Sequence, residues 1–163
     1  MIILGIDPGT TAIGYALVDG HRLDPILKTA GLFRIRSKTR EGRLRELHKE
    51  LTPLIKRWEP SALAIEKIFF SRNQKTALEV AESRGAILLI TSLAGLDAHE
   101  YTPLEVKKSV TGAGNADKLQ VEKIIRLTLR GAGDFYASDD AFDAIAVALT
   151  CFYKLRGLGR RVA

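Results

Sequence analysis

IILGIDPGTTAIGYALVDG, which spans residues 2–20 of the 163-residue chain, decides the fold. The short apolar run of residues 2–6 ends at Asp7-Pro8-Gly9, which predicts a buried strand stopped by a turn. Residues 13–18 predict a second strand, and Asp19-Gly20 is another turn signal. A third strand is expected between residues 26 and 35. The amino-terminal part of the chain therefore predicts a meander of three strands joined by tight connections.

A change of period after this meander predicts a helix. Apolar residues recur at spacings of three and four between residues 44 and 58, and charged residues fill the gaps, which is the pattern of an amphipathic helix. Pro53 is expected to kink or split this helix, because proline removes a backbone donor. Trp58, near the end of the pattern, is expected to pack in the core rather than to stack on a nucleic-acid base.

The rest of the chain alternates strands and helices. Residues 62–65 form an apolar run that predicts a fourth strand ending at Glu66, and residues 99–101 predict a short fifth strand. Helices are expected at residues 74–93, 103–110, 118–130 and 139–155. This order predicts an α/β fold with a five-stranded mixed central sheet flanked by helices, and it resembles the ribonuclease H-like architecture.

Length and composition are those of one globular domain. Hydrophobic residues make up 46% and charged residues 27%, and 163 residues can bury a core without a disulfide. We expect a single domain over residues 1–155, followed by a short basic tail over residues 156–163. The single cysteine, Cys151, excludes an intramolecular disulfide and a zinc site made of cysteines, and its apolar neighbours predict a buried thiol.

The charge of the chain favours a polyanionic partner. Lys and Arg number 25 against 19 Asp and Glu, which gives a formal net charge of +6 and a pI near 9.6. Nucleic acid is the commonest such partner, although many small proteins carry this charge without binding anything. No apolar run approaches the ~20 residues of a membrane span. The first residues also lack the basic region of a signal peptide, so we expect a cytoplasmic protein with no membrane partner.

Four acids stand out by position: Asp7, Glu66, Asp140 and Asp143. Asp7 and Glu66 each follow an apolar run directly, which places them at the margin of the core. Asp140 and Asp143 are three residues apart, on one face of the last predicted helix. Carboxylates gathered in a partly desolvated place repel one another unless cations bind between them. Their hard oxygen ligands suit Mg²⁺ or Mn²⁺, and two such ions about 4 Å apart can hydrolyse a phosphodiester.

Each acid also has a simpler explanation. An Asp before Pro-Gly is often only a turn former, and Asp140 could merely complement the helix dipole. Asp143 lies among apolar neighbours, where an acid is usually paired or bound to a metal. Asp139 competes with Asp140, since it is four residues before Asp143. We assign Asp139 to capping the helix, with Ser138 as the rival cap.

Several segments resemble the RuvC family of Holliday-junction resolvases. GIDPGT at residues 5–10, followed by Gly14-Tyr15, is similar to the opening of these proteins. AIEKIF at residues 64–69 resembles their second acidic strand, and Arg72-Asn73 follows at the expected place. VKK at residues 106–108 and GAGNADK at residues 112–118 resemble two basic segments, and DAFDAIA at residues 140–146 resembles the closing helix. These matches fall in order across nearly the whole chain.

The resemblance implies a metal-dependent endonuclease that resolves four-way DNA junctions by paired nicks in recombination and repair. It implies that the four acids are catalytic and bind the metal, with Mg²⁺ as cofactor, Mn²⁺ as a substitute and two ions per site. It favours Asp140 over Asp139. Phe69 corresponds to a base-stacking aromatic, with Phe70 as the alternative. The further DNA-binding residues it implies are Arg72, Asn73, Lys75, Lys107, Lys108 and Lys118.

Partners follow from the same resemblance. A four-way junction has near two-fold symmetry, so two opposed cuts suit a homodimer. The helix of residues 74–93 is the candidate interface because of its small residues Ala77, Ala81, Gly85 and Ala86, although core packing could use the same residues. The family also works beside a branch-migration complex of the RuvA-RuvB type, which grips the same junction.

Three other interpretations are weaker. The opening with Asp19 also resembles the first phosphate loop of sugar kinases and chaperone ATPases, but the chain is too short for two lobes and has no second glycine-rich loop. We therefore expect no nucleotide binding. The small RuvX/YqgF group shares the opening, yet the segment around Glu66 and the pair Asp140 and Asp143 favour RuvC. The third is a junction-binding protein that has lost cleavage; a missing acid would have indicated it, and all four acids are present.

Overall fold

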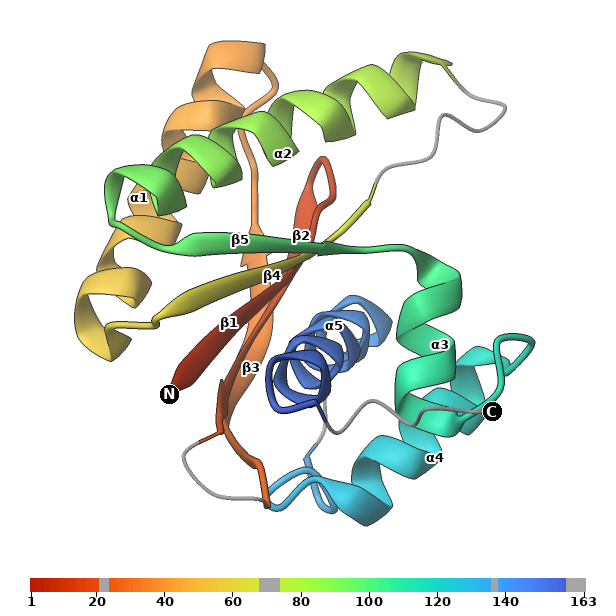
Figure 1. Cartoon of the computed structure of the whole chain (residues 1–163). Coiled ribbons are helices and arrows are strands. Elements are labelled where there is room, and N and C mark those ends of the chain that lie inside the picture. The colour runs from red at the N-terminus through yellow and green to blue at the C-terminus, as the bar shows by residue number, and fades with distance from the viewer. Residues whose placement is uncertain (21–23, 68–73, 136–137, 158–163) are drawn as a thin grey trace.

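A five-stranded mixed sheet forms the centre of the molecule, in the order β3-β2-β1-β4-β5. The computed structural model describes residues 1–20, 24–67, 74–135 and 138–157 (Figure 1). The antiparallel meander consists of β1 (Ile2–Asp7), β2 (Ala12–Asp19) and β3 (Ile26–Arg34). The parallel strands beside β1 are β4 (Ala62–Glu66) and β5 (Asp97–Tyr101). All strands except β2 therefore finish at one end of the sheet, which we call the acid end.

Helices cover both faces of the sheet (Figure 1). One face carries α1 (Arg40–Trp58) and α2 (Gln74–Leu93). The other carries α3 (Pro103–Thr111), α4 (Lys118–Thr128) and α5 (Asp139–Leu155). The alternation of side chains along each strand divides the core in two: Leu4 and Ile6 pack on the α1 and α2 side, whereas Ile3 packs on the α5 side. This α/β arrangement confirms the predicted fold class.

Glycines let α5 lie unusually close to the sheet. A Cβ atom on Gly5 would lie 2.2 Å from the backbone oxygen of Ala144, and a Cβ on Gly14 would lie 1.9 Å from that of Asp140. Both distances are shorter than any contact a real Cβ makes, and a helix backbone cannot give way locally as a flexible side chain can. Glycine inside a strand is typical of such a close backbone approach. The helix is consequently buried along most of its length.

The predicted elements agree with the structure in type and order. Two details, at Pro53 and at the start of α5, are corrected. Helix α1 runs unbroken through Pro53, so the expectation that Pro53 splits it is wrong. Pro53 is exposed, and water can satisfy the carbonyl that it leaves without a partner. Ser138, not Asp139, is the N-cap of α5, and its side chain makes no capping hydrogen bond.

The structure also bears on the expectations for Trp58, for Cys151 and for membrane-spanning segments. Trp58 is half-buried against the core on the α1 and α2 side, and Cys151 is fully buried. None of the helices in the described part of the chain is long and apolar enough to cross a bilayer.

Candidate active site

Strand geometry brings Asp7 and Glu66 to the acid end, on the face that α5 covers. Side chains two residues apart share a face of a strand, so Asp7 shares a face with Ile3 and Glu66 with Ala64. Ile3 and Ala64 both belong to the core on the α5 side. Because β1 and β4 are parallel neighbours, their last residues lie side by side. The two acids that end apolar runs in the sequence therefore meet below one helix.

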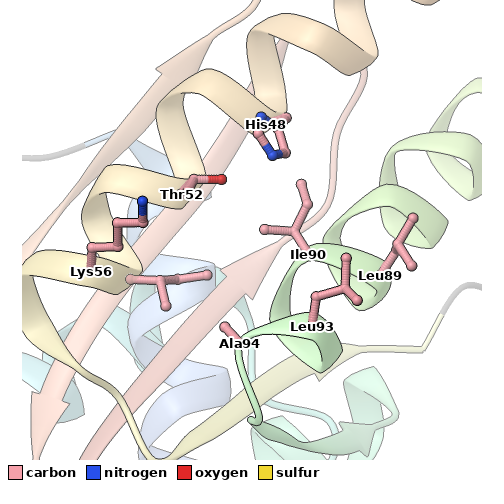
Figure 2. A pocket seen from close by; sticks show the side chains of 8 residues that line it. His48, Thr52, Lys56, Leu89, Ile90, Leu93 and Ala94 are labelled. Atoms are coloured by element: carbon pink, nitrogen blue, oxygen red, sulfur yellow. The ribbon is translucent and has the colours of Figure 1, made fainter.

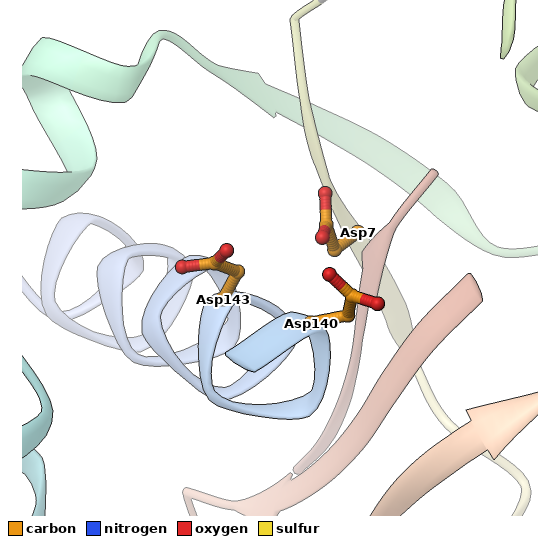
Figure 3. Close-up of side chains that lie close together, drawn as sticks. All are labelled: Asp7, Asp140 and Asp143. Carbon is orange, nitrogen blue, oxygen red and sulfur yellow. The ribbon is translucent and has the colours of Figure 1, made fainter. Parts of the chain in front are cut away.

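The first turns of α5 complete the cluster. Asp140 and Asp143 lie one turn apart, and with Asp7 each offers a carboxylate oxygen within 4.8 Å of the others. Figure 3 shows the three carboxylates gathered between the end of β1 and the start of α5. Asp139 is exposed and lies outside this group, so the structure brings together the acid-x-x-acid pair that was expected. Three close, partly buried carboxylates are a donor set suited to a hard divalent cation.

Glu66 lies outside the group of three but beside it. It lines a pocket of about 160 Å³ together with Asp143, Lys107 and Lys118. Burial raises its pKa, and the negative charge of Asp143 raises it further, whereas Lys118 and Lys107 lower it. The carboxylate of Glu66 is thus electrostatically part of the same centre.

The neighbouring acids disfavour the ionisation of Asp7. Burial, together with the charges of Asp143, Glu66 and Asp140, raises the pKa of Asp7 to about 7, although Lys118 lowers it. A carboxylate with such a pKa is at the midpoint of its titration near neutral pH instead of being fully ionised. A divalent cation between the carboxylates would replace repulsion by attraction. The donor set and its electrostatics therefore both fit a metal centre.

Two of the three predicted lysines in the described region reach the pocket. The Nζ atom of Lys118 donates a hydrogen bond of 2.9 Å to Oδ2 of Asp143, which raises the pKa of Lys118. Lys107 is half-buried on α3 and lines the pocket beside Glu66. Lys108, the next residue, is exposed and does not line it. The structure thus places Lys107 at the pocket and Lys108 outside it.

Other predicted DNA-binding positions fall outside what the structure describes. Phe69, Arg72 and Asn73, together with the alternative Phe70, lie in residues 68–73, outside the described residues. Lys75 belongs to α2, but its side chain is likewise not among those described.

Sequence reasoning missed the residues that let the cluster form. Gly5 and Gly14 carry no functional group, yet their missing side chains allow α5 to bring Asp140 and Asp143 to Asp7. The available signal was a glycine inside each of two predicted strands, which is typical of a close backbone approach.

A second pocket, of about 290 Å³, lies between α1 and α2 on the opposite face of the sheet. Figure 2 shows its lining, in which Leu89, Ile90 and Leu93 of α2 face His48, Thr52 and Lys56 of α1. None of the described residues that line it is acidic, so it is separate in place and chemistry from the acid cluster.

Comparisons with known proteins agree with this geometry. The family model "Crossover junction endodeoxyribonuclease RuvC" matches residues 3–151. A curated protein of that name from Heliobacterium modesticaldum is 41% identical over 158 residues, which cover 95% of this chain and 96% of the relative. One from Desulfitobacterium hafniense is 40% identical over 163 residues, with 98% and 97% covered.

A solved structure agrees as well. The structure described as Thermus thermophilus RuvC in complex with Holliday junction substrate superimposes with a TM-score of 0.86 at 30% identity and covers 98% of each chain. A family model over most of the chain, relatives at about 40% identity and a matching fold all point the same way. The chain belongs to the RuvC family of crossover junction endodeoxyribonucleases.

Proposed function

We propose that this protein is a structure-selective endodeoxyribonuclease that resolves four-way (Holliday) DNA junctions by paired symmetric nicks in homologous recombination and repair. The observation that carries the proposal is the cluster of Asp7, Asp140 and Asp143 at the acid end of a RuvC-family fold. Its relatives are named crossover junction endodeoxyribonucleases, and a similar structure contains a Holliday junction.

The cofactor is Mg²⁺, for which Mn²⁺ can substitute, with two ions in each active site. Asp7, Glu66, Asp140 and Asp143 would hold these ions, and all four carboxylates are catalytic. The ions would supply an activated water and stabilise the leaving oxygen, which yields a 5′-phosphate and a 3′-hydroxyl without a covalent enzyme intermediate. The mutual repulsion of the four acids supports this assignment.

Lys107 and Lys118 hold the scissile phosphate beside these acids. Both line the pocket that also contains Glu66 and Asp143, so an anion there would meet two ammonium groups. In the protein alone, Lys118 neutralises part of the charge of Asp143. We assign Lys108, Lys75, Arg72 and Asn73 to the surrounding DNA backbone and Phe69 to base stacking at the junction centre.

The active protein is a homodimer, because two opposed cuts need two sites related by the symmetry of the junction. Helix α2 supports this proposal, since its exposed side includes Leu78, Leu89 and Leu93 beside Gly85. A Cβ on Gly85 would meet nothing within 4 Å, which leaves room for a close partner. Ala86, by contrast, packs against the core.

We further propose that residues 1–155 form one nuclease domain, with residues 156–163 as a basic tail. Both halves of the core share one sheet, which supports this division. The protein would act in the cytoplasm beside a RuvA-RuvB type branch-migration complex.

Cleavage of a synthetic, end-labelled four-way junction tests the function. Linear duplex with the same arm sequence is the control substrate, and Mg²⁺, Mn²⁺ and EDTA are compared for the wild type and Asp7→Asn. We expect paired nicks in the junction only, with either metal, and none in Asp7→Asn, which should still bind the junction. Binding without cutting in either metal would make the protein a binding module. No preference for junction over duplex would contradict the proposal altogether.

A further inference from the structure

A group of cations without side-chain partners among the described residues lies at the acid end of the sheet, on the side of β3. We call residues 34–38 the basic segment; it connects the end of β3 to α1 and reads Arg34-Ile35-Arg36-Ser37-Lys38 (Figure 1). Arg34, Arg36 and Lys38 are exposed. No hydrogen bond, ion pair or ring contact joins their side chains to any residue in the described part of the chain. Arg40 and Arg43, which follow, are paired with Glu82 and Glu79.

The register of the sheet relates this segment to the acid cluster. Asp7 is opposite Gly14, and Gly14 is opposite Leu32, so these residues share the face that α5 covers. Arg34 is two residues beyond Leu32 and projects from the same face, whereas Phe33 and Ile35 point into the core on the other side. Two strand spacings and two residue rises place the Cα of Arg34 roughly 12 Å from that of Asp7.

The backbone of the basic segment is held in place on both sides. Oε2 of Glu46 on α1 accepts hydrogen bonds from the backbone N–H groups of Arg36, at 2.7 Å, and Ser37, at 3.2 Å. The N–H of Ile35 donates to the carbonyl of Thr11, at 2.8 Å, in the turn that follows Asp7. The cations are therefore presented from a fixed backbone, which lowers the entropy lost when a ligand binds them.

We propose that Arg34, Arg36 and Lys38 bind backbone phosphates of the junction on the side of the acid cluster opposite Lys107 and Lys118. This inference rests on the proposed function and adds a second group of phosphate-binding residues to it. When no metal ions are bound, the four carboxylates repel the phosphates of a strand that crosses them. Cations on the β4 side alone, where Lys107 and Lys118 lie, would support only one flank of that strand. Guanidinium groups suit the other flank, because they bind phosphate oxygens in pairs.

The salt dependence of junction binding tests this proposal. A variant with Arg34→Gln, Arg36→Gln and Lys38→Gln is compared with one carrying Lys49→Gln, Lys56→Gln and Arg57→Gln, three exposed cations farther along α1. Both variants lose three positive charges, so their net charges are equal. Binding is measured in the Asp7→Asn background, with fluorescently labelled four-way junction, over a series of KCl concentrations. We expect the first variant to lower the slope of log affinity against log salt by about two to three, and to weaken binding about tenfold or more, relative to the second.

The outcomes separate this inference from the function on which it rests. Equal slopes and affinities for the two triple variants would show that the basic segment does not touch phosphates. Arg34→Lys with Arg36→Lys keeps the charge and should restore the slope, which guards against a variant that merely folds badly; a failure to restore it would contradict an electrostatic role. If the wild type itself neither prefers nor cuts the junction, the proposed function fails, and this inference fails with it.

Discussion

A Cβ atom on Gly14 would lie 1.9 Å from the backbone carbonyl oxygen of Asp140. Gly14 is also the antiparallel register partner of Asp7. It therefore lies beside Asp7 and against the first turn of α5, which carries Asp140. The absence of a side chain there fixes how closely the start of α5 approaches the end of β1. The geometry of the candidate metal centre therefore depends on a residue that has no ligand atom of its own.

Gly14→Ala should move Asp140 and Asp143 away from Asp7 without removing any of the three carboxylates. The added methyl has to push the first turn of α5 away, and overpacking of this kind costs about 1–3 kcal/mol of stability. We expect junction cleavage to fall by about a hundredfold, since a shift of about 1 Å has that effect on a catalytic group. Gly133→Ala is the control, because its Cβ would come no closer than 3.9 Å to its nearest neighbour. Cleavage rates and urea unfolding are measured for both; equal rates would contradict the proposed dependence.

The metal-free protein should lose stability as the pH rises. Burial and neighbouring acids raise the pKa of Asp7 from 3.8 to about 7, so the folded state binds a proton more tightly than the unfolded state does. The resulting stabilisation is fully present below about pH 4 and is lost as the pH rises through about 7. At this partly exposed site we expect a loss of about 2 kcal/mol.

Urea unfolding in EDTA at pH 5 and pH 8 measures this effect. Asp7→Asn cannot ionise, so its stability should change less between the two pH values, and at pH 8 it should exceed that of the wild type. Mg²⁺ should raise the stability of the wild type at pH 8, with a smaller gain in Asp7→Asn. A wild type that is equally stable at both pH values in EDTA would contradict the repulsion inferred for the cluster.

Asp139 and Asp140 offer a matched pair of adjacent acids. Asp140 belongs to the carboxylate group, whereas Asp139 is exposed and lies outside it. Asp140→Asn should lower cleavage by at least about a hundredfold, since it would remove a charged ligand from the proposed metal centre. Asp139→Asn should change cleavage by less than about threefold. Junction cleavage at saturating Mg²⁺ compares the two, and a reversed order would move the site by one residue along α5.

Lys107 and Lys108 form a second matched pair. Lys107 lines the pocket with Glu66 and Asp143, but Lys108 is exposed and does not. Lys107→Gln should reduce the rate of single-turnover cleavage by about ten- to a hundredfold, because it removes the cation that we propose lies beside the scissile phosphate. Lys108→Gln should mainly lower the affinity and its salt dependence. Comparable rates for the two variants would leave the pocket without a role in phosphate binding.

The dimer proposed through α2 can be tested with exposed leucines. Leu89 and Leu93 of α2 are 60% and 81% exposed, and Leu119 and Leu127 of α4 are 77% and 72% exposed. Leu89→Gln with Leu93→Gln should give a monomer in sedimentation equilibrium, whereas Leu119→Gln with Leu127→Gln should remain a dimer. Both pairs should fold normally, since exposed substitutions change stability by about 0.5 kcal/mol or less. A dimer that survives in the first pair would exclude this part of α2 as the interface.

Most of the fold could be predicted from local sequence patterns. The apolar runs and turn signals in residues 2–20 and the period of three to four after Leu44 depend on the neighbours of each residue, so the order and type of the elements could be predicted from them. The exception at Pro53 arose because its effect on a helix depends on exposure, which a linear pattern does not contain.

The sequence by itself determined which acids stand at the ends of apolar runs and that Asp140 and Asp143 share a helix face, because both follow from the spacing of residues along the chain. Only the tertiary structure decided that Asp7 meets acids more than 130 positions later, that Lys107 and not Lys108 reaches Glu66, and that the basic segment lies beside the turn after Asp7. Contacts between distant elements depend on how closely their surfaces pack, and at the acid cluster that closeness comes from Gly5 and Gly14, which have no side chain.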